Sequence, residues 1–526
     1  MQPSKLSTCL ALVIAFVSFF YTIESMAKPK YTSAESFIKD QTNIRIVTDA
    51  AAGFGNQTAS YNLIVRLRQM GYQGSFEFIY PNEATDKITT LFDLPKDIAD
   101  DYKDEKRNIR FIKLKNYITA YNNKTAELVT LGMSGADGAA NVCLVAKSEG
   151  ADVNNIDAAT CKNYAKLFNT QVFAKLSPFI YQAEERTWPS KFDTEIYLHD
   201  QTESQSQIGS DSTFITMPVA DLTQTKNYLK NDPRGQELLS QKPALKTLID
   251  TIENKTVNVM PVYGYTLQML GICSDFYKTE SDCLFAKLSN MLEVIAGARF
   301  AQLFDLQHLQ KPLIIPVFYN YTKEADGLTQ LIDGKLWKSI TLPEAKPAAR
   351  MIEALGLRHH FSTANIDDPS AIRQIQTLKH GQILLLSVGP LPKVVFDGIY
   401  THTGDNVWPQ IREGANSFNS LILTGKPHFR CAGSEGWEIG FDLVKDARLK
   451  NQLQNFYNYQ NGFCRSEAWQ NTHNSAVINL GKFIMEANNP HSSLSNYFTQ
   501  LKATALKPEN DRIQFALTGV IALLDK

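Results

Sequence analysis

The chain has 526 residues, of which 44% are hydrophobic and 20% are charged, and its formal net charge is −1 at pH 7. This composition is typical of a folded globular protein and leaves room for two or three domains. The balanced charge excludes a bulk electrostatic attraction to nucleic acid or to an anionic membrane, so we expect no nucleic-acid partner.

The first residues of the chain differ from the rest. Lys5 precedes a nearly continuous apolar run, Leu6 to Ile23, and the small residues Ser25 and Ala27 then suit a cleavage site. This layout predicts a signal peptide over residues 1–27 and an exported protein, secreted or held in a periplasm or lumen. The alternative is a membrane anchor formed by residues 6–23, because such a run is just long enough to span a bilayer. We expect membrane contact only in that case.

Seven cysteines occur, and six of them lie beyond the leader. An even number in an exported chain suggests disulfides, although the sequence alone allows many pairings. Because the cysteines fall into three couples that are close in sequence, we favour Cys143–Cys161, Cys273–Cys283 and Cys431–Cys464. The chain has no Cys-x-x-Cys pair and no convincing Asp-x-Asp pair, so we predict no metal site.

The first half of the mature chain begins with a strand, a loop, a helix and a second strand. Ile44–Thr48 is the first strand, residues 49–57 form a loop of small residues, and Thr58–Met70 has helical apolar spacing. Phe76–Tyr80 is the next strand. The pattern predicts a βαβ unit with a glycine turn at its crossover. In open α/β sheets, ligands bind outside the carboxyl ends of the strands, where this loop lies.

Strands continue to alternate with helices up to about residue 250. The further predicted strands are Ile109–Leu114, Leu128–Gly132, Val142–Lys147, Val172–Phe179 and Glu195–His199. Ala158–Phe168 has a helical pattern, and residues 220–250 are helical and polar with a break at Pro243. We therefore predict an N-terminal α/β domain over residues 40–250.

The alternation restarts after residue 250. The predicted strands are Val257–Val262, Pro312–Phe318 and Ile383–Val388, and the last two are nearly continuous apolar runs, as buried parallel strands are. The predicted helices are Leu288–Phe304, Ala345–Leu355, Ser370–Leu378, Ala476–Ala487 and Ile513–Leu524. These patterns predict a second α/β domain over residues 251–500 and a C-terminal helix within residues 501–526.

A turn of small residues at 414–417 precedes a short apolar segment, Phe418–Leu423, which Gly425 and Pro427 bring to an end. Glycine after a helix is a common C-cap, and proline prevents its continuation. A helix that begins at such a turn offers unpaired backbone N–H groups to an anion. The alternative is ordinary helix capping by Asn and Ser, which any α/β protein can contain.

The spacing of Gly414, Asn416, Ser417, Gly425 and Pro427 resembles the donor-binding element of GT-B glycosyltransferases. The same stretch is similar to the corresponding motif of protein-arginine rhamnosyltransferases, and the first glycine loop resembles that of GT-B enzymes. The chain also departs from these families. It has Ser420 where many GT-B enzymes carry a ribose-binding glutamate, and Ala415 and Asn416 where the rhamnosyltransferase motif is acidic.

The resemblance implies an α/β protein with two Rossmann-like domains facing a cleft. It also implies a hexosyltransferase that moves a sugar from a nucleotide sugar to an unidentified acceptor without a metal or other cofactor. The donor would bind in the C-terminal half and the acceptor in the N-terminal half. The donor-binding residues implied by the resemblance are Gly53, Gly55, Asn56, Gln57, Gly389, Pro390, His402, Glu413, Gly414, Ala415, Asn416 and Ser417.

GT-B enzymes often have a His or Asp after the second glycine of the first loop. Here Asn56 and Gln57 occupy that place, and neither is a general base. Asp49, at the end of the first strand, is therefore our candidate for the base that takes a proton from the acceptor. The alternative is that Asp49 only caps the loop or helix, and a lone histidine such as His402 is also often structural.

Two other functions fit the sequence. An exported two-domain binding protein also closes two α/β lobes on a ligand. A catalytically degenerate glycosyltransferase would act as an interaction module. Both account for export and for the missing conventional base, whereas nucleotide sugars are scarce outside a cytosol or a secretory lumen.

Overall fold

The computed structural model describes residues 31–49, 55–135, 142–176, 192–201, 205–209, 219–263, 279–305, 310–412, 417, 420–430, 475–508 and 511–525. The predicted leader, Gly53, the segment 413–416 and the predicted Cys431–Cys464 bridge lie outside the described residues. Among the helices that are described, none is long and apolar enough to cross a membrane.

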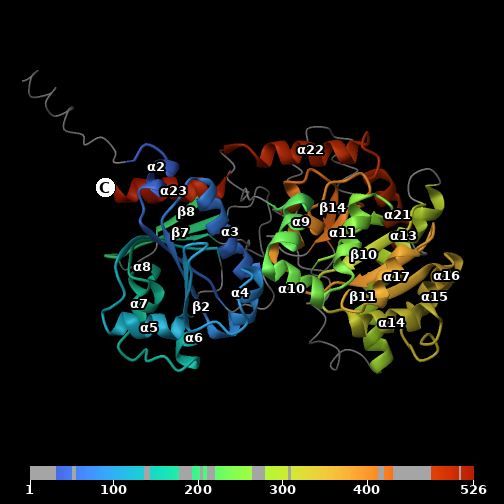
Figure 1. Cartoon of the computed structure of the whole chain (residues 1–526), viewed down its shortest axis with the longest axis horizontal. Coiled ribbons are helices and arrows are strands. Elements are labelled where there is room, and N and C mark those ends of the chain that lie inside the picture. Colours follow the sequence, from blue (N-terminus) through green and yellow to red (C-terminus); the bar gives the residue numbers. More distant parts are fainter. Residues whose placement is uncertain are drawn as a thin grey trace, which may run out of the picture.

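Figure 1 shows two α/β domains side by side. Within the described residues, the sheet of the first domain has eight strands in the order β3-β4-β2-β1-β5-β6-β7-β8. The strands are β1 Asn43–Val47, β2 Ser75–Tyr80, β3 Asp101–Asp104, β4 Ile109–Lys113, β5 Val129–Ser134, β6 Thr170–Leu176, β7 Phe192–Leu198 and β8 Gln205–Gly209. The five central strands are parallel, and β3, β7 and β8 are antiparallel at the two edges.

The chain reverses direction across this sheet at β1. It runs from β1 through β2 to β4 on one side, and then from β5 to β6 on the other side. This is the strand order of a Rossmann-like sheet, and its topological switch point lies between β1 and β5. The helices are α2 Ala34–Lys39, α3 Gly55–Gln69, the 3-10 turn η1 Asn82–Ala84, α4 Thr85–Leu91, α5 Leu114–Asn122, α6 Val142–Ser148, α7 Ala158–Lys162 and α8 Tyr164–Leu167.

Side chains that alternate along β1 enter two separate cores. Ile44 and Ile46 pack with Leu63 and Leu67 of α3, whereas Val47 packs with Ile118 of α5 on the opposite face. Both faces of the sheet are therefore covered by helices, as a parallel sheet requires.

One predicted strand of the first domain is wrong. Residues 142–147 belong to α6, because the apolar run sits in the crossover between the parallel strands β5 and β6. Val142 and Ala146, one helical turn apart, are buried, while Leu144 between them is 60% exposed. A short apolar run does not distinguish a strand from a helix by itself. The same helix carries Cys143, which forms the predicted disulfide with Cys161.

The second domain contains a second parallel sheet. Its described strands are β9 Asn258–Val259, β10 Leu313–Val317, β11 Phe361–Asn365, β12 Ile383–Ser387, β13 Gln410–Arg412 and β14 His428–Arg430. Four of them pair in the order β11-β12-β10-β9, and β13 pairs with β14. Parallel bridges from Val259 of β9 to Val407, and from Val262 to Ile411 of β13, place the segment that contains β13 beside the segment that contains β9. The combined strand order therefore has a second topological switch point, which lies between β9 and β13.

The helices of the second domain cover both faces of this sheet. They are α9 Leu222–Asn231, α10 Pro233–Gln241, α11 Leu245–Glu253, α13 Glu280–Phe304, α14 Thr322–Ile332, α15 Ala345–Ala354, α16 Leu357–His360, α17 Ser370–Gln376, α18 Lys393–Tyr400, α21 Ser475–Ala487 and α22 Ser493–Ala505. Cys283 of α13 is disulfide-bonded, while its predicted partner Cys273 lies outside the described residues. The fold is therefore α/β with two Rossmann-like domains, which confirms the predicted class.

The packing divides the chain differently from the predicted boundary near residue 250. Leu222, Leu245 and Leu248 of α9 and α11 belong to the same core as Leu384 and Leu386 of β12. The helices between residues 222 and 253 therefore pack with the second domain. Their assignment needs long-range contacts, which a polar helical pattern does not reveal.

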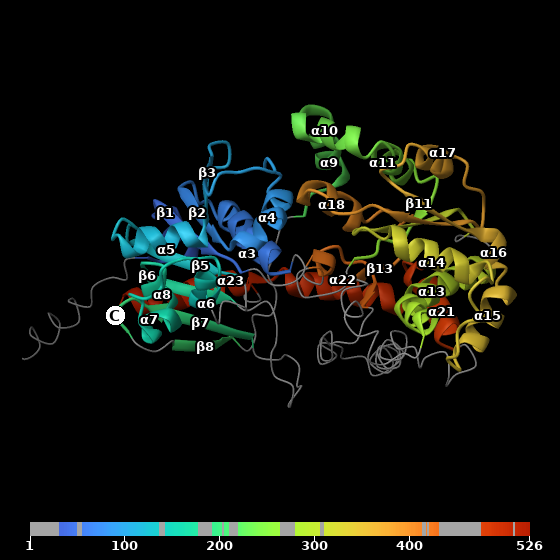
Figure 2. The ribbon, with the colours of Figure 1, turned by 90° about the horizontal axis from the view of Figure 1, so that it is seen from below.

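The last helix, α23 (Arg512–Leu524), returns to the first domain. Ile513, Leu517 and Val520 enter the core that contains β1 and α3. Asp511 caps this helix and forms a 2.5 Å ion pair with Arg66 of α3. In both views α23 lies along the first domain, away from its sequence neighbour α22 (Figures 1 and 2).

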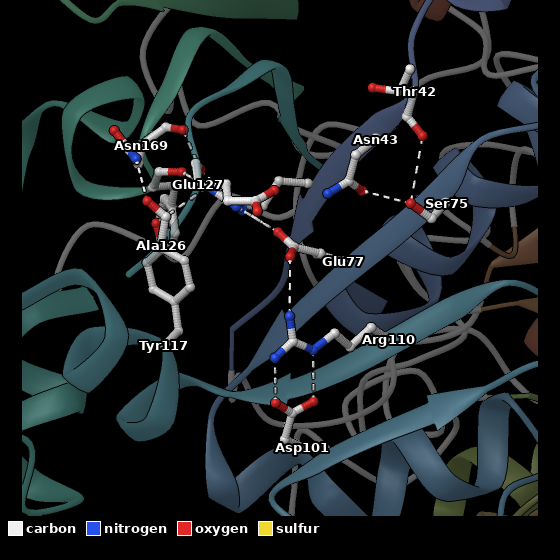
Figure 3. Close-up of polar contacts among 12 residues, drawn as sticks. Thr42, Asn43, Ser75, Glu77, Asp101, Arg110, Tyr117, Ala126, Glu127 and Asn169 are labelled. Atoms are coloured by element: carbon white, nitrogen blue, oxygen red, sulfur yellow. Dashed lines mark hydrogen bonds and ion pairs between the residues drawn. The ribbon is translucent and has the colours of Figure 1, made fainter. Parts of the chain in front are cut away.

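Polar contacts gather around Glu77 of β2 in the first domain, where Arg110 lies between Glu77 and Asp101 (Figure 3). The Arg45 guanidinium is 1% exposed and donates to Glu77 through Nε at 2.8 Å and through Nη2 at 2.5 Å. It also donates to the backbone carbonyls of Phe168, Asn169 and Glu127. Glu77 in turn pairs with Arg110, which binds Asp101 through two nitrogens. This network pairs the buried charge with several partners.

Candidate functional site

The carboxyl end of β1 carries the predicted base. Asp49 is 8% exposed, and Nδ2 of Asn56 donates to both of its carboxylate oxygens, at 2.9 and 2.8 Å. Nε2 of Gln57 donates to the backbone carbonyl of Asp49 at 2.7 Å. The first turn of α3 is thus tied to the end of β1. The structure brings Asp49, Asn56 and Gln57 together beside the switch point of the first sheet.

Two buried polar atoms at this place have no hydrogen-bond partner within the described structure. They are Oγ1 of Thr48 and Oε1 of Gln57. The loop after β5 also lies close, because a Cβ atom on Gly135 would be 2.7 Å from the backbone of Ala59 in α3. The switch point therefore combines a carboxylate, an unsatisfied hydroxyl and an unsatisfied amide oxygen, which are groups that hydrogen-bond hydroxyl-bearing ligands.

A cation that no local sequence motif indicated lies within the electrostatic influence of Asp49. Lys87 lies in the first turn of α4, which follows β2. Burial lowers the pKa of the Lys87 ammonium, while the charges of Asp49 and Glu83 raise it. Its position in the first helical turn after the second predicted strand is the signal that would have identified it, since the carboxyl ends of parallel strands share one edge.

The flanks of the predicted donor turn lie at the switch point of the second sheet. Arg412, the last residue of β13, is 3% exposed, and Ser417 is buried as well. The Tyr400 hydroxyl donates to the carbonyl of Ile411 at 3.1 Å, and Ser417 hydrogen-bonds the same hydroxyl. Both ends of the segment 413–416 are therefore anchored at the carboxyl end of β13, and Arg412 brings a positive charge to this place.

An aromatic cluster lies next to this anchor. Tyr263 follows the bridge at Val262, Phe318 follows β10, and Phe396 and Tyr400 come from α18. The Phe396 and Tyr400 rings stack at 4.9 Å, and the Tyr263 ring meets Phe396 edge-on at 5.3 Å. Tyr263 and Phe396 are half-buried, whereas Phe318 and Tyr400 are buried. Two partly accessible rings thus stand on a buried aromatic base, a group the sequence analysis did not identify.

Gly389 and Pro390 follow β12 at the same edge of the second sheet. Gly389 has a φ of +71°, a left-handed conformation that favours glycine. Nζ of Lys242 donates to the neighbouring carbonyl of Val388 at 2.9 Å. Because β10 and β9 lie between β12 and β13, this loop is about three strand spacings from Arg412, roughly 14 Å.

His402 lies apart from the other predicted donor residues. It follows α18 and precedes β13, so it sits at the amino ends of the strands rather than at their carboxyl ends. Its carbonyl accepts from Nε2 of Gln410 at 3.3 Å. Burial lowers the pKa of the His402 imidazole, and the nearby Lys255 and Lys426 lower it further. The structure therefore does not bring His402 to Ser417 or Gly389.

Comparisons with known proteins give only weak similarities. No family model and no curated protein matches the chain. Among solved structures, the chain is similar to an alpha-glucosyltransferase in complex with UDP-glucose and DNA containing an abasic site, with 8% identity and a TM-score of 0.30 over 87% of this chain and 99% of that one. It is also similar to an alpha,alpha-trehalose-phosphate synthase (UDP-forming) from Burkholderia vietnamiensis, with 9% identity and a TM-score of 0.29 over 92% and 98%.

Both TM-scores are too low to support a functional conclusion, so our assignment of the fold depends on the strand order alone.

Within the described residues, no group of three or more His, Cys, Asp or Glu side chains is arranged to hold a metal ion.

Proposed function

We propose that this protein is a GT-B-like glycosyltransferase that moves a hexosyl group from a nucleotide sugar to an acceptor. The observation that carries the proposal is the position of Arg412 and Ser417. They are the buried flanks of the predicted donor turn, at the switch point of the second sheet. Ligands of open α/β sheets bind at this kind of place.

In this proposal the donor binds to the second domain. Backbone N–H groups of the 414–416 turn and the Arg412 guanidinium receive the diphosphate. Tyr263 and Phe396 stack against the nucleobase, an interaction that typically contributes about 1–3 kcal/mol per base. Stacking accepts any base, so this aromatic platform would select only weakly among nucleobases.

The acceptor binds to the first domain. Its hydroxyl or amide attacks the anomeric carbon of the donor, the bond from that carbon to the diphosphate oxygen breaks, and the nucleoside diphosphate leaves with the electron pair. Asp49 takes the proton of the acceptor. Asn56, through its two contacts with Asp49, keeps the carboxylate oriented.

A disulfide supports the part of the proposal that concerns location. The Cys143–Cys161 bridge and the bonded Cys283 suit an oxidising compartment. We therefore propose export or a secretory lumen. N-terminal sequencing of the exported protein tests this location, and we expect the mature chain to begin at Lys28. A chain that still begins at Met1 in a membrane fraction would favour the anchor.

A thermal-shift screen with UDP, GDP, CDP and TDP tests the donor site. At a nucleotide concentration 100 times the dissociation constant, binding stabilises the folded state by about 2.7 kcal/mol. We expect Gly414→Val to remove this stabilisation, because a side chain there obstructs the approach of phosphate to the backbone. His402→Ala is the matched control and should bind nucleotides like the parent, since His402 lies at the opposite edge of the sheet.

Two results would contradict the proposal. One is a Gly414→Val variant that binds every nucleotide as the parent does. The other is a loss of binding in His402→Ala alone. Tight binding of a nucleotide sugar without transfer or hydrolysis would instead favour the two-lobed binding protein.

A further inference from the structure

Two ion pairs cross the junction between the domains. Nη1 of Arg234, in the first turn of α10, lies 3.6 Å from Oδ2 of Asp93, which follows α4. Nζ of Lys106, in the turn between β3 and β4, donates to Oδ2 of Asp232 at 3.3 Å. In both views α9 and α10 lie on the side of the second domain that faces α4 (Figures 1 and 2). We call these two ion pairs the latch.

The backbone at Asp93 is unusual for an acidic residue. Its φ is +49°, in the left-handed region that L side chains rarely adopt. The Asp93 N–H donates to the carbonyl of Thr90 at 3.3 Å and ends α4. The Leu94 N–H donates to that of Thr89 at 2.8 Å, which completes a Schellman motif. A carboxylate there also lies at the negative end of the helix dipole. Asp93 is therefore disfavoured locally by both its backbone and its charge.

Two other helices of this chain show what suits this position. Lys124 follows α5 and Lys255 follows α11, with φ values of +56° and +53° and the same hydrogen-bond pattern. A lysine there interacts favourably with the helix dipole. Among the non-glycine residues of positive φ that the structure describes, Asp93 is the acidic one. The end of α4 alone therefore does not account for Asp93, and a cation from another element is needed to offset its charge.

Arg234 is the counterpart of Asp93 on α10. It is the second residue of that helix, where a cation opposes the positive end of the dipole. The Asp93 and Arg234 side chains are 18% and 37% exposed, so water screens their attraction less than it screens an exposed pair. Lys106 is 78% exposed, and its pair with Asp232 contributes less. The charges of Asp93 and Arg234 are thus each disfavoured in their own helix and compensated by the other across the junction.

Contacts lead from the latch to the aromatic cluster. α10 packs closely on α9, because a Cβ atom on Gly235 would lie 2.3 Å from the carbonyl oxygen of Tyr228. Oγ1 of Thr225 in α9 donates to the carbonyl of Val394 in α18 at 2.7 Å. The same α18 carries two stacked rings of the aromatic cluster. The latch therefore joins the first domain to the helices that hold this cluster.

We propose that the latch holds α9 and α10 against the first domain and releases them as ionic strength rises. A locally disfavoured arrangement persists only where the surrounding structure compensates for it. Salt weakens the two pairs, because the Debye length falls from about 10 Å at 0.1 M to about 3 Å at 1 M ionic strength. While closed, the latch fixes the aromatic cluster relative to α4. The inference concerns the contact between the domains, so it does not depend on what either domain binds.

Amide hydrogen exchange of the full chain at about 0.1 M and about 1 M NaCl tests the latch. Within α10 the buried residue is Gly235, so we expect the protection of residues 236–241 to depend on the latch. In the parent, exchange there should be at least threefold faster at the higher salt. Asp93→Asn removes the charge and keeps a residue that tolerates a positive φ. It should exchange at least threefold faster than the parent at the lower salt and respond less than twofold to added salt.

Charge reversal separates the latch from the local effect of Asp93. Asp93→Lys places there the residue type of Lys124 and Lys255, so α4 itself should keep its protection. Residues 236–241 of α10 should nevertheless exchange at least threefold faster, because the ion pair is lost. The double variant Asp93→Lys with Arg234→Asp rebuilds the pair with each charge suited to its own helix. We expect it to return exchange in α10 to within twofold of the parent.

Glu105→Gln is the matched control. It removes an ion pair with Lys103, 2.8 Å away in the same turn region of the first domain, and that pair does not cross the junction. It should leave exchange in α10 unchanged. The proposal is overturned if Asp93→Lys leaves exchange in α10 within twofold of the parent, or if the double variant exchanges as fast as Asp93→Lys. Equal acceleration by Glu105→Gln would overturn it too, since it would indicate general loosening. Asp93→Asn decides the question if Asp93→Lys does not fold.

Discussion

Two buried polar residues, Arg45 within β1 and Thr48 directly after it, differ in whether their polar atoms have hydrogen-bond partners. Arg45, in the strand, is a buried cation whose guanidinium reaches Glu77 and three backbone carbonyls. Thr48, just past the other end, is also buried, but its hydroxyl has no partner within the described residues. A buried polar group therefore contributes to stability only where its partners are buried with it. Groups without partners are candidates for a ligand.

The largest expected effect is at Arg45. Arg45→Met keeps an apolar stem but leaves Glu77 and the three carbonyls without their donor. We expect a loss of about 3–5 kcal/mol in the free energy of unfolding, as when one partner of a buried ion pair is removed. Urea denaturation measures it. A loss below about 1 kcal/mol would show that Arg110, 3.6 Å from Glu77, replaces Arg45.

Glu293 of α13 is the reverse of Arg45, because it is a buried acid with no hydrogen-bond partner in the part of the chain that the structure describes. It is 1% exposed, and both carboxylate oxygens lack hydrogen bonds within the described structure. Burial raises the pKa of the Glu293 carboxyl well above its ordinary value of 4.5. The folded protein then holds this proton more tightly than the unfolded chain, so stability falls as pH rises above about 4.5 until the folded pKa is reached.

The slope attributable to Glu293 is about 1.4 kcal/mol per pH unit within that window. We expect Glu293→Leu and Glu293→Gln to remove this part of the pH dependence, because neither side chain ionises. Urea unfolding at several values between pH 5 and pH 8 measures the slopes. Parallel stability profiles for the parent and both variants would contradict the prediction.

A smaller effect is expected at Asn56. Asn56→Ala removes both hydrogen bonds to the buried carboxylate of Asp49, and we expect a loss of about 1–3 kcal/mol. Asn62→Ala is the control, because it trims a second buried amide from α3 whose Nδ2 atom has no partner in the described structure. The difference between the variants in chemical denaturation isolates the hydrogen bonds. Equal losses would mean that packing alone accounts for both.

The smallest effect is expected at Thr48. Thr48→Val removes a hydroxyl that has no partner among the described residues, so the free energy of unfolding should change by less than about 0.5 kcal/mol. Ser60→Ala, whose hydroxyl donates to the carbonyl of Val47 at 3.1 Å, should cost about 1 kcal/mol. Thermal unfolding of both variants makes the comparison. A larger loss for Thr48→Val than for Ser60→Ala would reverse the assignment of partners.

The sequence predicted the parts of the fold that are local and strongly apolar. The nearly continuous apolar run Ile383–Val388 predicted a buried strand, and all five residues of β12 are buried. It did not predict β11, since Phe361–Asn365 is only half-buried and lacks an apolar pattern. It assigned α9 to α11 to the wrong domain, because polar helices give no sign of the core on which they pack.

The same limit applies to the candidate site. Asp49, Asn56 and Gln57 are close in sequence, so one loop was enough to group them. The charge of Asp49 acts on Lys87, which comes from a different βα unit. Tyr263 meets Phe396 because the segments after β9 and β12 leave the same sheet at its carboxyl edge. His402 was grouped with the donor residues because it is near them in sequence. The strand order, which no local pattern contains, separates them.

The return of α23 to the first domain has a consequence for biosynthesis. Ile513, Leu517 and Val520 complete a core that otherwise contains residues from the first part of the chain. A ribosome that has made the first domain has not yet made the helix that covers its sheet. The second domain therefore has its helices available before the first one does, and the N-terminal half stays incompletely packed until translation ends. For a chain that crosses a membrane before folding, this delay favours passage in the unfolded state.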